Sequence, residues 1–464
     1  MNASELSSSY DLVVVGGGPA GLAAASLAAR AGLATVLFDE NPGVGGQIYR
    51  GITSTPVANR AVLGEDYWAG TALATEAKAS GALIVAGATV WSLDPSLQVG
   101  VSIAGRARLI QARRVIVATG SLERPFPVPG WTLPGVMSAG AAQTALKGQG
   151  LVPSGRTVMA GAGPLLWLLA AQLLRAGANI EAILDTAPRL NWLRALAHLP
   201  DFALSPYWSK GLALLREVKA KVPVIRVSTL EARGDDQLRE VSFDGRRQPA
   251  DLLLLHQGVV PNVNLAMAAG VEHRWNERQL CFEPVLDQDF GSSVSGIAVA
   301  GDGAGIAGGT AAAERGRLAA IAAVRALKSD ATVPDPQAIR QTLQREEMGR
   351  AFLDWLYRPP ETLRQPTGET LACRCEEVTA AQVRDMARIG CEGPNQMKAF
   401  LRCGMGPCQG RMCGLTITEL IAAERETSPA EVGYWRLRPP VKPITLGELA
   451  SLPIAEAERK AVER

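Results

Sequence analysis

The stretch DLVVVGGGPAGLAAASLAARAGLATVLFDE, residues 11–40, decides the fold of the N-terminal part of the chain. A wholly apolar run, typical of a buried parallel strand, leads directly into the glycine-rich turn GGGPAG at 16–21. An alanine-rich segment predicts a helix, and 34–38 predict a second strand that ends in two acids. This order predicts a βαβ unit that binds a dinucleotide. The residues expected to contact it are Gly16, Gly18, Pro19, Ala20, Gly21, Asp39 and Glu40.

The glycines of this turn have separate steric tasks. Gly16 allows the tight turn, Gly18 lets the backbone approach a pyrophosphate, and Gly21 lets helix and strand pack closely. The amino end of the helix offers amide donors and a positive dipole end to the phosphates. A carboxylate from Asp39 or Glu40 would accept hydrogen bonds from the adenosine ribose and disfavour a 2′-phosphate.

Later segments favour FAD over NAD at this first site. VIVATG at 115–120 is typical of two-domain flavoproteins, and IAVAGDG at 297–303 resembles their second FAD motif, whose aspartate binds the ribityl chain. With GGQ at 45–47 and GGT at 308–310, these segments resemble the glutathione-reductase-like flavoprotein superfamily over about residues 10–325. The resemblance implies an α/β fold with two dinucleotide-binding domains. The further cofactor contacts it implies are Gly46, Gln47, Val90, Ala118, Thr119, Gly120, Gly301, Asp302 and Thr310.

The glycine pattern occurs a second time. VMAGAGPLL at 158–166 precedes another predicted helix, strand and acid. In the superfamily this domain binds NAD(P)H, here through Gly161 and Gly163. Leu166 replaces the third glycine, and its bulk is expected to push helix from strand and crowd the phosphates. Three hypotheses stay open for this fold: NAD(P)H, another adenine nucleotide such as ATP, or a scaffold without a ligand.

The flavin region contains no redox dithiol. Residues 10–330 hold a single cysteine, Cys281, so the CxxC chemistry of disulfide reductases is excluded. His198, His256 and His273 form no cluster in the sequence, and each is expected to be a core or surface residue. No complete substrate-oxidising site is predicted, and catalytic residues are left unassigned.

Six of the seven cysteines fall within residues 373–413. In a reducing compartment, such clustering favours metal binding over disulfides. A C-x-C pair opens the segment, and Thr379 with Gln382 predicts a capping box at the start of a short helix. A second helix is expected over about 395–402, and the two helices would bring distant thiols together.

Spacing alone leaves the metal and its ligands open. Structural zinc prefers C-x₂₋₄-C pairs at both ends. A C-x-C pair with a later cysteine pair instead resembles the bacterioferritin-associated ferredoxin (BFD-like) [2Fe–2S] domain. Cys403, Cys408 and Cys413 follow at equal intervals, so spacing does not select two of them. The resemblance implies Cys373, Cys375, Cys408 and Cys413 as ligands, with Cys403 as a neighbouring thiol or alternative ligand and Cys391 as a buried helix-end cysteine.

The bulk composition suits a globular chain with large cores: 47% of residues are hydrophobic, 20% are charged, and the net charge is +2. No concentrated basic face is indicated, so nucleic acid is not an expected partner. The N-terminus lacks a basic stretch before a long apolar one, so a cytoplasmic location is predicted. The expected parts are an FAD-binding domain at 1–125 and 285–325, a second Rossmann-type domain at 126–284, a linker at 326–366, a BFD-like domain at 367–422 and an extended tail at 423–464.

The tail contains YWRLRPPVKP at 434–443. Prolines impose extended backbone, and aromatic and arginine side chains are frequent anchors at interfaces. The segment is therefore predicted either to strap along its own chain or to bind another one.

Nearly the whole chain resembles the HcnB-like A, or alpha, flavoprotein subunits of heteromeric amino-acid and opine dehydrogenases. The shared stretches are GGQIYR at 45–50, LGEDYWAG at 63–70, ATGSLERPFPVPGWTLPGVMSAGAAQ at 118–143, GDGAGIAGG at 301–309 and the CxC…CQGxxC segment. The resemblance implies a D-amino-acid-oxidase-like beta subunit that carries FAD and removes hydride from a C–N bond. It also implies a small ferredoxin-like gamma subunit with another [2Fe–2S] centre, and in some members an extra flavin, FMN, between subunits.

On this resemblance, the chain is expected to pass electrons from the beta-subunit flavin through its own cofactors to an acceptor such as a quinone. That acceptor would place it on the cytoplasmic face of the inner membrane. Candidate substrates are glycine (converted to HCN), D-hydroxyproline, octopine and nopaline. Two rival hypotheses stay open: a stand-alone NAD(P)H-dependent reductase, and a docking module without enzymatic activity.

Overall fold

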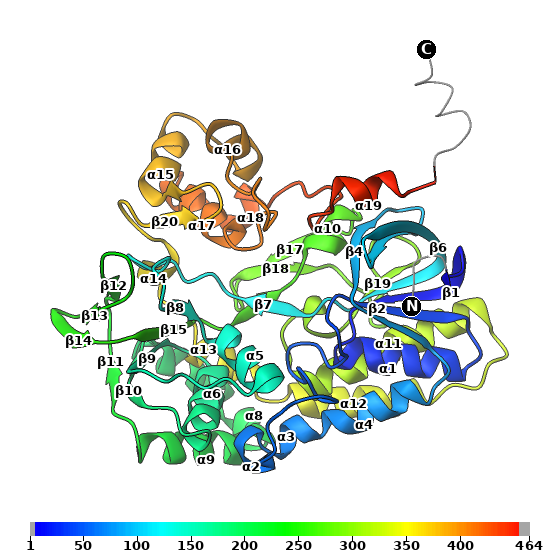
Figure 1. The fold of residues 1–464 in the computed structure, drawn as a ribbon, viewed down its shortest axis with the longest axis horizontal. Coiled ribbons are helices and arrows are strands. Elements are labelled where there is room, and N and C mark those ends of the chain that lie inside the picture. Colours follow the sequence, from blue (N-terminus) through cyan, green and yellow to red (C-terminus); the bar gives the residue numbers. More distant parts are fainter. Residues whose placement is uncertain (1–4, 454–464) are drawn as a thin grey trace.

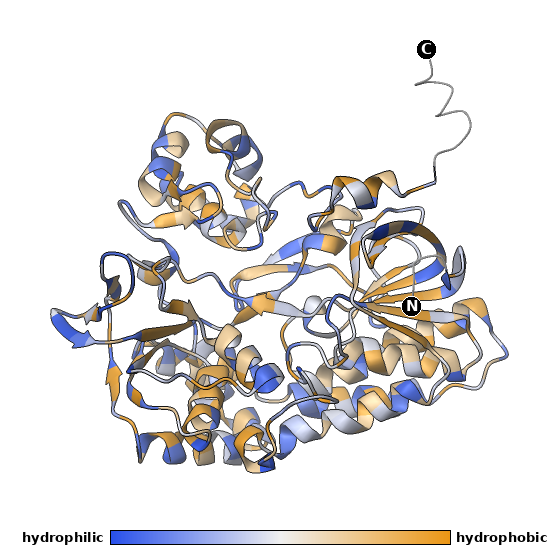
Figure 2. Cartoon of the chain, viewed as in Figure 1, coloured by the Kyte–Doolittle hydropathy of each residue, from blue (hydrophilic) through white to orange (hydrophobic). Residues whose placement is uncertain are grey.

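The computed structural model describes residues 5–453. Two domains built on parallel sheets lie side by side, and a small helical module sits above them in the view of Figure 1. Orange apolar segments line both sheets, and blue polar segments lie mostly at the periphery (Figure 2). Within the described residues, no helix is long and apolar enough to cross a membrane.

The first domain contains a seven-stranded sheet centred on the apolar run that precedes the first glycine turn. Alternate residues of this run enter the cores on the two faces of the sheet, which explains why it is apolar throughout. A strand from far along the chain, β19, returns to pair in parallel with β6. The order is β3 (Leu83–Ala86), β2 (Thr35–Asp39), β1 (Ser9–Val15), β6 (Arg106–Val117), β5 (Gln98–Ile103) and β4 (Ala88–Leu93), with β19 (Ile297–Val299) beside β6.

Two helices, α1 (Pro19–Arg30) and α11 (Gly309–Leu327), pack closely on one face of this sheet. Small residues permit the approach, because a Cβ on Gly316 would lie 2.1 Å from the carbonyl oxygen of Ala20. Both helices follow parallel strands, so their amino ends share the carboxyl edge of the sheet. The predicted βαβ unit and the distant second FAD motif are thereby brought together, and the predicted fold class is confirmed.

The second domain has a fully parallel five-stranded sheet. Helices α5 (Ala139–Gln149), α6 (Pro164–Arg175) and α9 (Tyr207–Lys219) cover one face, and a small antiparallel sheet of β12 (Glu231–Arg233), β13 (Glu240–Phe243) and β14 (Arg246–Pro249) covers the other. The order of the main sheet is β11 (Val224–Arg226), β10 (Ile180–Asp185), β9 (Thr157–Gly161), β15 (Leu252–His256) and β8 (Val136–Ser138). A ribbon of β7 (Ser121–Glu123) and β16 (Val259–Pro261) connects this domain to the first one.

The division expected at residue 285 differs from the structure. After the ribbon, α10 (Asn264–Ala268) packs on β4, and its Leu265 and Ala266 enter the core of the first domain. The hairpin of β17 (His273–Asn276) and β18 (Cys281–Pro284) follows it. The apolar side chains of α10 are needed to cover the first sheet, so the second domain ends near the ribbon.

The predicted linker forms helices that pack on both flavin-type domains. Helix α12 (Pro336–Glu347) lies against α11, and α13 (Arg350–Leu356) lies against α7 (Asn191–Ala195). A short helix, α14 (Glu361–Arg364), then leads to the cysteine module, and its Leu363 packs into the core of the second domain. Its Arg364 pairs with the buried Glu419, which ties the linker to the module.

The cysteine module contains a two-stranded ribbon, β20 (Leu371–Cys373) and β21 (Val378–Thr379), and four helices: α15 (Ala380–Arg388), α16 (Pro394–Leu401), α17 (Gly414–Glu424) and α18 (Pro429–Val432). The predicted capping box of Thr379 and Gln382 is confirmed. The second predicted helix corresponds to α16.

The tail follows the strap alternative as far as residue 453, and 454–464 lie outside the described residues. Its Trp435 is buried in the core of the module. The backbone N–H of Val441 donates to the carbonyl oxygen of Trp91 at 2.9 Å, and Val441 enters the core of the first domain. A final helix, α19 (Leu446–Ala450), lies by β6.

Lys147 on α5 predicts a measurable pH dependence of stability. Its side chain is 3% exposed, its Nζ donates to the carbonyl oxygen of Ile48 at 2.9 Å, and burial lowers its pKa to about 7. The unfolded chain binds a proton at this site up to about pH 10, so the site makes the free energy of unfolding rise between pH 7.5 and 9.5. The slope is roughly 1.4 kcal/mol per pH unit at most.

We expect Lys147→Met to lose this slope, as measured by urea unfolding at several pH values. The matched control is Lys78→Met, because Lys78 is an exposed lysine on α4 (Gly70–Lys78). Equal pH dependence in wild type and Lys147→Met would contradict a neutral amine in the folded protein.

Candidate functional site

The first glycine turn lies at the carboxyl edge of the first sheet. A Cβ on Gly16 would lie 2.4 Å from the carbonyl oxygen of Ala118, and one on Gly21 would lie 1.8 Å from that of Gly16. Only glycine fits at either position. Gly18 is different, because its nearest neighbour on that side is the Cα of Gly46 at 3.8 Å. A Cβ on Gly18 would thus make only ordinary van der Waals contact, and α1 begins there without a side-chain cap, which leaves its amides available to an anion.

The two acids at the end of β2 have different environments. Asp39 is buried, its Oδ2 accepts from the N–H of Gly17 at 2.6 Å, and its Oδ1 accepts from that of Asn41 at 2.7 Å. Glu40 is exposed and pairs with Lys442 of the tail at 2.6 Å. The structure therefore places Asp39 at the turn, where a ribose would lie, and gives Glu40 a partner that sequence reasoning did not foresee.

The second FAD motif forms the other side of this edge. Oδ1 of Asp302 accepts from the N–H groups of Ala307 and Gly308, each at 3.0 Å. These bonds fix the loop that leads into α11, whose first turn contains Thr310. Gly301, one residue earlier, is buried against the Cβ of Ala20 in α1. The second FAD motif thus packs against α1 next to the glycine turn, although the two segments are far apart in the sequence.

The remaining predicted contacts surround the same edge. The N–H of Gly45 donates to the carbonyl oxygen of Gly17 at 2.7 Å, which joins the GGQ segment to the turn. The side chain of Gln47 accepts from Thr144 of α5 at 3.3 Å. Thr119 Oγ1 donates to the carbonyl oxygen of Asn262 at 3.2 Å, whereas Val90 lies in the core. The other members of the predicted set, Pro19, Ala20, Ala118 and Gly120, lie at the ends of α1 and β6.

The second glycine turn is occupied by a side chain of the same chain. A Cβ on Gly163 would lie only 3.0 Å from Nε2 of His256, at the end of the neighbouring strand. The ring of His256 is 1% exposed, and its Nδ1 contacts the carboxylate of Glu123 on the connecting ribbon. The imidazole therefore approaches Gly163 more closely than any neighbour approaches Gly18 in the first fold.

The end of β10 is covered as well. Tyr357 of the linker packs into the core cluster of the second domain. Burial, with a further contribution from the carboxylate of Asp185, raises the pKa of Tyr357 to about 12. Asp185 is the acid that would meet a ribose in this fold. Leu166 is fully buried in the same core, where it extends the packing of α6.

Five thiols meet in the cysteine module. Hydrogen bonds from the thiols of Cys403 and Cys413 lower the pKa of Cys373 to about 2. Cys375 bonds to Cys408 and lies at the surface. The four predicted ligands thus lie together with Cys403. Cys391 is apart from them, since its Sγ donates to the carbonyl oxygen of Gly393 at 3.5 Å.

The donor chemistry of this group fits an iron–sulfur cluster, because the iron ions of such a cluster bind to cysteine thiolates. Within residues 5–453, however, no group of three or more His, Cys, Asp and Glu side chains has the geometry of a metal site. The thiols are held by bonds to one another, so a cluster would require small movements of their side chains.

Aromatic residues of the tail support the turns that present these thiols. Cβ atoms on Gly404 and Gly410 would lie 2.9 and 2.5 Å from the indole of Trp435. A Cβ on Gly414 would lie 2.1 Å from the hydroxyl of Tyr434. Sequence reasoning assigned these aromatics no place at the cysteines. The sequence signal that could have indicated this position is the occurrence of a Tyr-Trp pair downstream of a glycine-rich cysteine segment.

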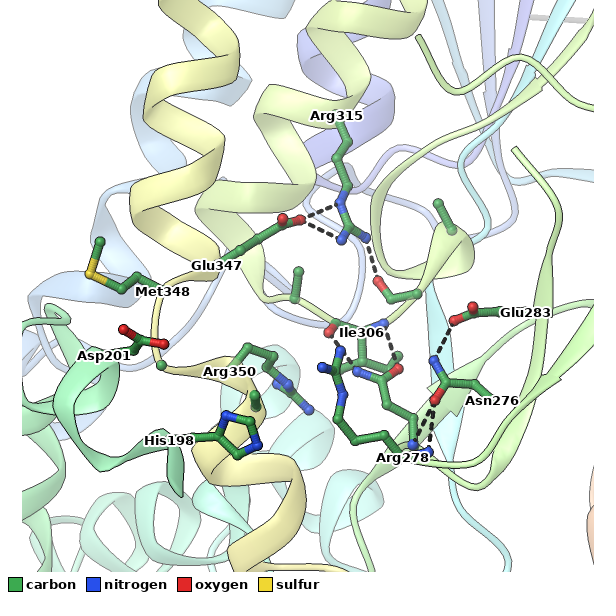
Figure 3. A pocket seen from close by; sticks show the side chains of 16 residues that line it. His198, Asp201, Asn276, Arg278, Glu283, Ile306, Arg315, Glu347, Met348 and Arg350 are labelled. Atoms are coloured by element: carbon green, nitrogen blue, oxygen red, sulfur yellow. Dashed lines mark hydrogen bonds and ion pairs between the residues drawn. The ribbon is translucent and has the colours of Figure 1, made fainter. Parts of the chain in front are cut away.

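A polar cavity of about 310 Å³ lies beside the loop that Asp302 fixes (Figure 3). The buried carboxylate of Asp354 anchors two of its arginines through their Nε atoms, Arg278 at 3.2 Å and Arg350 at 2.7 Å. Gln279 joins them to the loop, because it exchanges hydrogen bonds with the backbone of Ile306. Sequence reasoning did not identify this cavity, which combines residues from four separate segments.

Residues 10–325 match the pyridine nucleotide-disulphide oxidoreductase family, and residues 368–452 match the sarcosine oxidase A3 domain. The chain is 47% identical to the A subunit of opine oxidase from Agrobacterium tumefaciens (strain Ach5), over 99% of this chain and 95% of that one. This chain belongs to the family of opine oxidase A subunits. The A3 match extends the cysteine module into the tail, in agreement with the packing of Trp435.

More distant relatives include the HcnB subunit of hydrogen cyanide synthase from Pseudomonas aeruginosa, 32% identical over 95% of this chain and 98% of that one. The alpha subunit of sarcosine oxidase from Rhizobium meliloti is 26% identical over 95% of this chain, which spans 42% of it. The solved structure of L-proline dehydrogenase from P. horikoshii shares the fold, with a TM-score of 0.72, 20% identity and coverage of 95% of this chain and 79% of that one. As a family member, the chain is an FAD-type flavoprotein and an oxidoreductase subunit of a heteromeric enzyme.

We expect Gly21→Ala to impair FAD binding, because the new methyl group would force α1 away from β1. Its Kd for FAD should rise roughly tenfold or more, equivalent to about 1.4 kcal/mol. The measurement is the flavin content of purified protein and titration of the apoprotein with FAD. Gly211→Ala on α9, which has nothing within 4 Å, is the control. A Gly21→Ala protein with normal affinity would show that the turn does not hold the cofactor.

We expect Cys408→Ala to lose iron and labile sulfide, whereas Cys403→Ala should retain both. The reason is the ligand set that the resemblance implies, with Cys403 as a neighbour. The measurement is iron, zinc and sulfide per chain after anaerobic purification, with Cys391→Ala as the control. Loss of iron from Cys403→Ala would make Cys403 a ligand, and zinc in the wild-type protein would refute the cluster.

Proposed function

We propose that this chain is the FAD- and [2Fe–2S]-containing electron-transfer subunit of a heteromeric dehydrogenase that oxidises the C–N bond of an amino acid or an opine. The observation that carries this proposal is that one chain contains two sites suited to redox cofactors. One is a dinucleotide site at Gly18, and the other is a group of five thiols. Octopine, nopaline, D-hydroxyproline and glycine are the candidate substrates, and the names of the relatives favour an opine.

When bound, FAD accepts two electrons and a [2Fe–2S] cluster carries one at a time, so together they convert hydride transfer into single-electron transfer. The protein contributes the environment of each cofactor. The uncapped amino end of α1 would hold the pyrophosphate, and Asp39 and Asp302 would orient the ribose and ribityl groups. Cys373, Cys375, Cys408 and Cys413 would hold the iron.

The proposed partners complete the enzyme. A beta subunit similar to D-amino-acid oxidases would carry FAD and the amine site, and a ferredoxin-like gamma subunit would carry a second cluster. FMN would lie at the interface with the beta subunit. The final acceptor would be a quinone or the respiratory chain at the cytoplasmic face of the inner membrane.

The geometry of the second fold opposes entry of electrons from NAD(P)H. The imidazole of His256 lies close to Gly163, and Tyr357 packs on the domain core near enough to Asp185 for its charge to raise the pKa of Tyr357. A dinucleotide could bind in the manner of a reductase only if both side chains moved. We therefore propose a scaffold role for this fold and rank the NAD(P)H-dependent reductase second. The imidazole of His256 would crowd the phosphates of ATP at this position in the same way.

We expect an amine substrate, and not NADH, to bleach the visible absorption of the purified complex. The chain is co-expressed with its neighbouring open reading frames and purified anaerobically. Octopine, nopaline, D-hydroxyproline and glycine are then added in turn, followed by NADH. Bleaching of flavin and cluster bands by one amine supports the relay role and identifies the substrate.

A separate sample of the isolated chain is the control. If NADH bleaches this sample at catalytic rates, the chain is a reductase and the relay proposal fails. Isolated protein without any flavin would instead support the docking-module hypothesis.

A further inference from the structure

A set of large apolar side chains lies exposed on the second domain. Of the exposed large hydrophobic residues in residues 5–453, six fall within one stretch of nineteen positions, 190–208. Leu190, Leu193 and Leu204 are 73%, 68% and 79% exposed. Such a concentration on a protein surface marks a place where another molecule binds. We call this set the aromatic face, and its members are Leu190, Trp192, Leu193, Leu196, Leu204 and Trp208.

The two tryptophans of this face are held in place from below. Trp192 contacts Phe352 edge-on with ring centroids 5.7 Å apart, and Trp208 contacts Phe202 in the same way at 5.7 Å. Phe202 and Phe352 are themselves stacked at 4.3 Å in a buried cluster. The indoles are therefore ordered before any partner arrives, which lowers the entropy cost of binding. Ordered tryptophans are frequent energetic centres of protein interfaces.

The aromatic face adjoins the polar cavity. His198 and Asp201 belong to the same stretch of chain and line one wall of that cavity, as Figure 3 shows. The opposite wall contains Ile306, in the loop that Asp302 fixes beside the predicted flavin site. A partner seated on the face would thus lie beside a cavity whose lining extends to the loop next to the predicted flavin site.

The charges around the face indicate the kind of surface that would meet it. Among residues 189–221 the exposed basic side chains outnumber the exposed acidic ones, with six against one. The one exposed acid there is Asp201, since Glu217 is half-buried and pairs with Arg175. A complementary partner has an apolar patch with an acidic rim. The six basic residues are Arg189, Arg194, Lys210, Arg216, Lys219 and Lys221, and of these Lys210 pairs with Asp66 at 2.8 Å, which leaves five against one.

We propose that the aromatic face is the docking site of the amine-oxidising flavin subunit, with the polar cavity enclosed between the two chains. This inference rests on the proposed function, because it takes the partner from there. It adds where that partner binds and the apolar, acid-rimmed surface that it presents. A second copy of this chain is the competing occupant, and its own basic surroundings disfavour it, since like charges would meet.

The test is made on the complex purified after co-expression with the neighbouring amine-oxidising subunit. The docking variants are Leu193→Asp and Leu204→Asp, both at solvent-exposed positions that folding does not require to be apolar. The matched controls are Ile389→Asp and Leu446→Asp, at positions 71% and 86% exposed outside this face. The Kd of the two subunits is measured by interferometry, and the mass of each sample by light scattering. Flavin content and melting temperature verify that every variant is folded.

We expect each docking variant to weaken the complex roughly tenfold or more, and the controls to stay within about twofold. Normal affinity in both docking variants would overturn the inference, as would an isolated chain that dimerises through Leu193 and Leu204. A wild-type chain that forms no complex with this subunit would also overturn it.

A separate readout distinguishes this inference from the proposed function. If the wild-type complex forms and the docking variants disrupt it, but no amine bleaches the wild-type complex, the docking site stands and the electron-relay role fails. If an amine bleaches the wild-type complex and the docking variants retain both binding and bleaching, the relay role stands and the docking site lies elsewhere.

Discussion

The contact on which the rest of the first domain depends is the close approach of α1 to the turn before it. Gly21 lies so near the carbonyl oxygen of Gly16 that no side chain fits, and Gly316 of α11 lies equally near the backbone of Ala20. These contacts fix two helices against one sheet edge. They place the loop of Asp302 within reach of the first glycine turn, although the two are far apart in the chain. A nucleotide site follows because uncapped amides and a buried acid then share one edge.

The glycine motif of the second fold has different surroundings from that of the first fold. Both turns begin with closely packed glycines, yet an imidazole lies 3.0 Å from a Cβ built on Gly163, whereas the nearest atom to one built on Gly18 is the Cα of Gly46 at 3.8 Å. The glycines at 161 and 163 are retained because the strand end at His256 approaches them, and this packing needs no ligand. A glycine pattern is therefore evidence of backbone proximity first and of nucleotide binding second. Leu166 is compatible with close packing of the backbone but unfavourable for nucleotide binding.

Much of this architecture could be predicted from the sequence because it depends on local signals. The strand at 11–15, the turn at 16–21 and the capping box at Thr379 are each encoded within a few residues. The misplaced boundary at 285, the pairing of His256 with Glu123 and the position of Trp435 beside the cysteine turns all depend on contacts between distant segments. Sequence periodicity does not report such contacts, and the family resemblance predicted none of these three.

The strap formed by the tail has a mechanical consequence. The cysteine module is attached at its start through Arg364 and Glu419, and at its end through Val441 and the bond of Lys442 to Glu40. A module tethered at both ends cannot swing on a hinge as a mobile carrier domain does. In the proposed relay, tunnelling of an electron would weaken steeply with separation, so a fixed geometry would give every turnover the same electronic coupling. The rate of internal transfer would then be set by driving force, and diffusion of the module would not limit it.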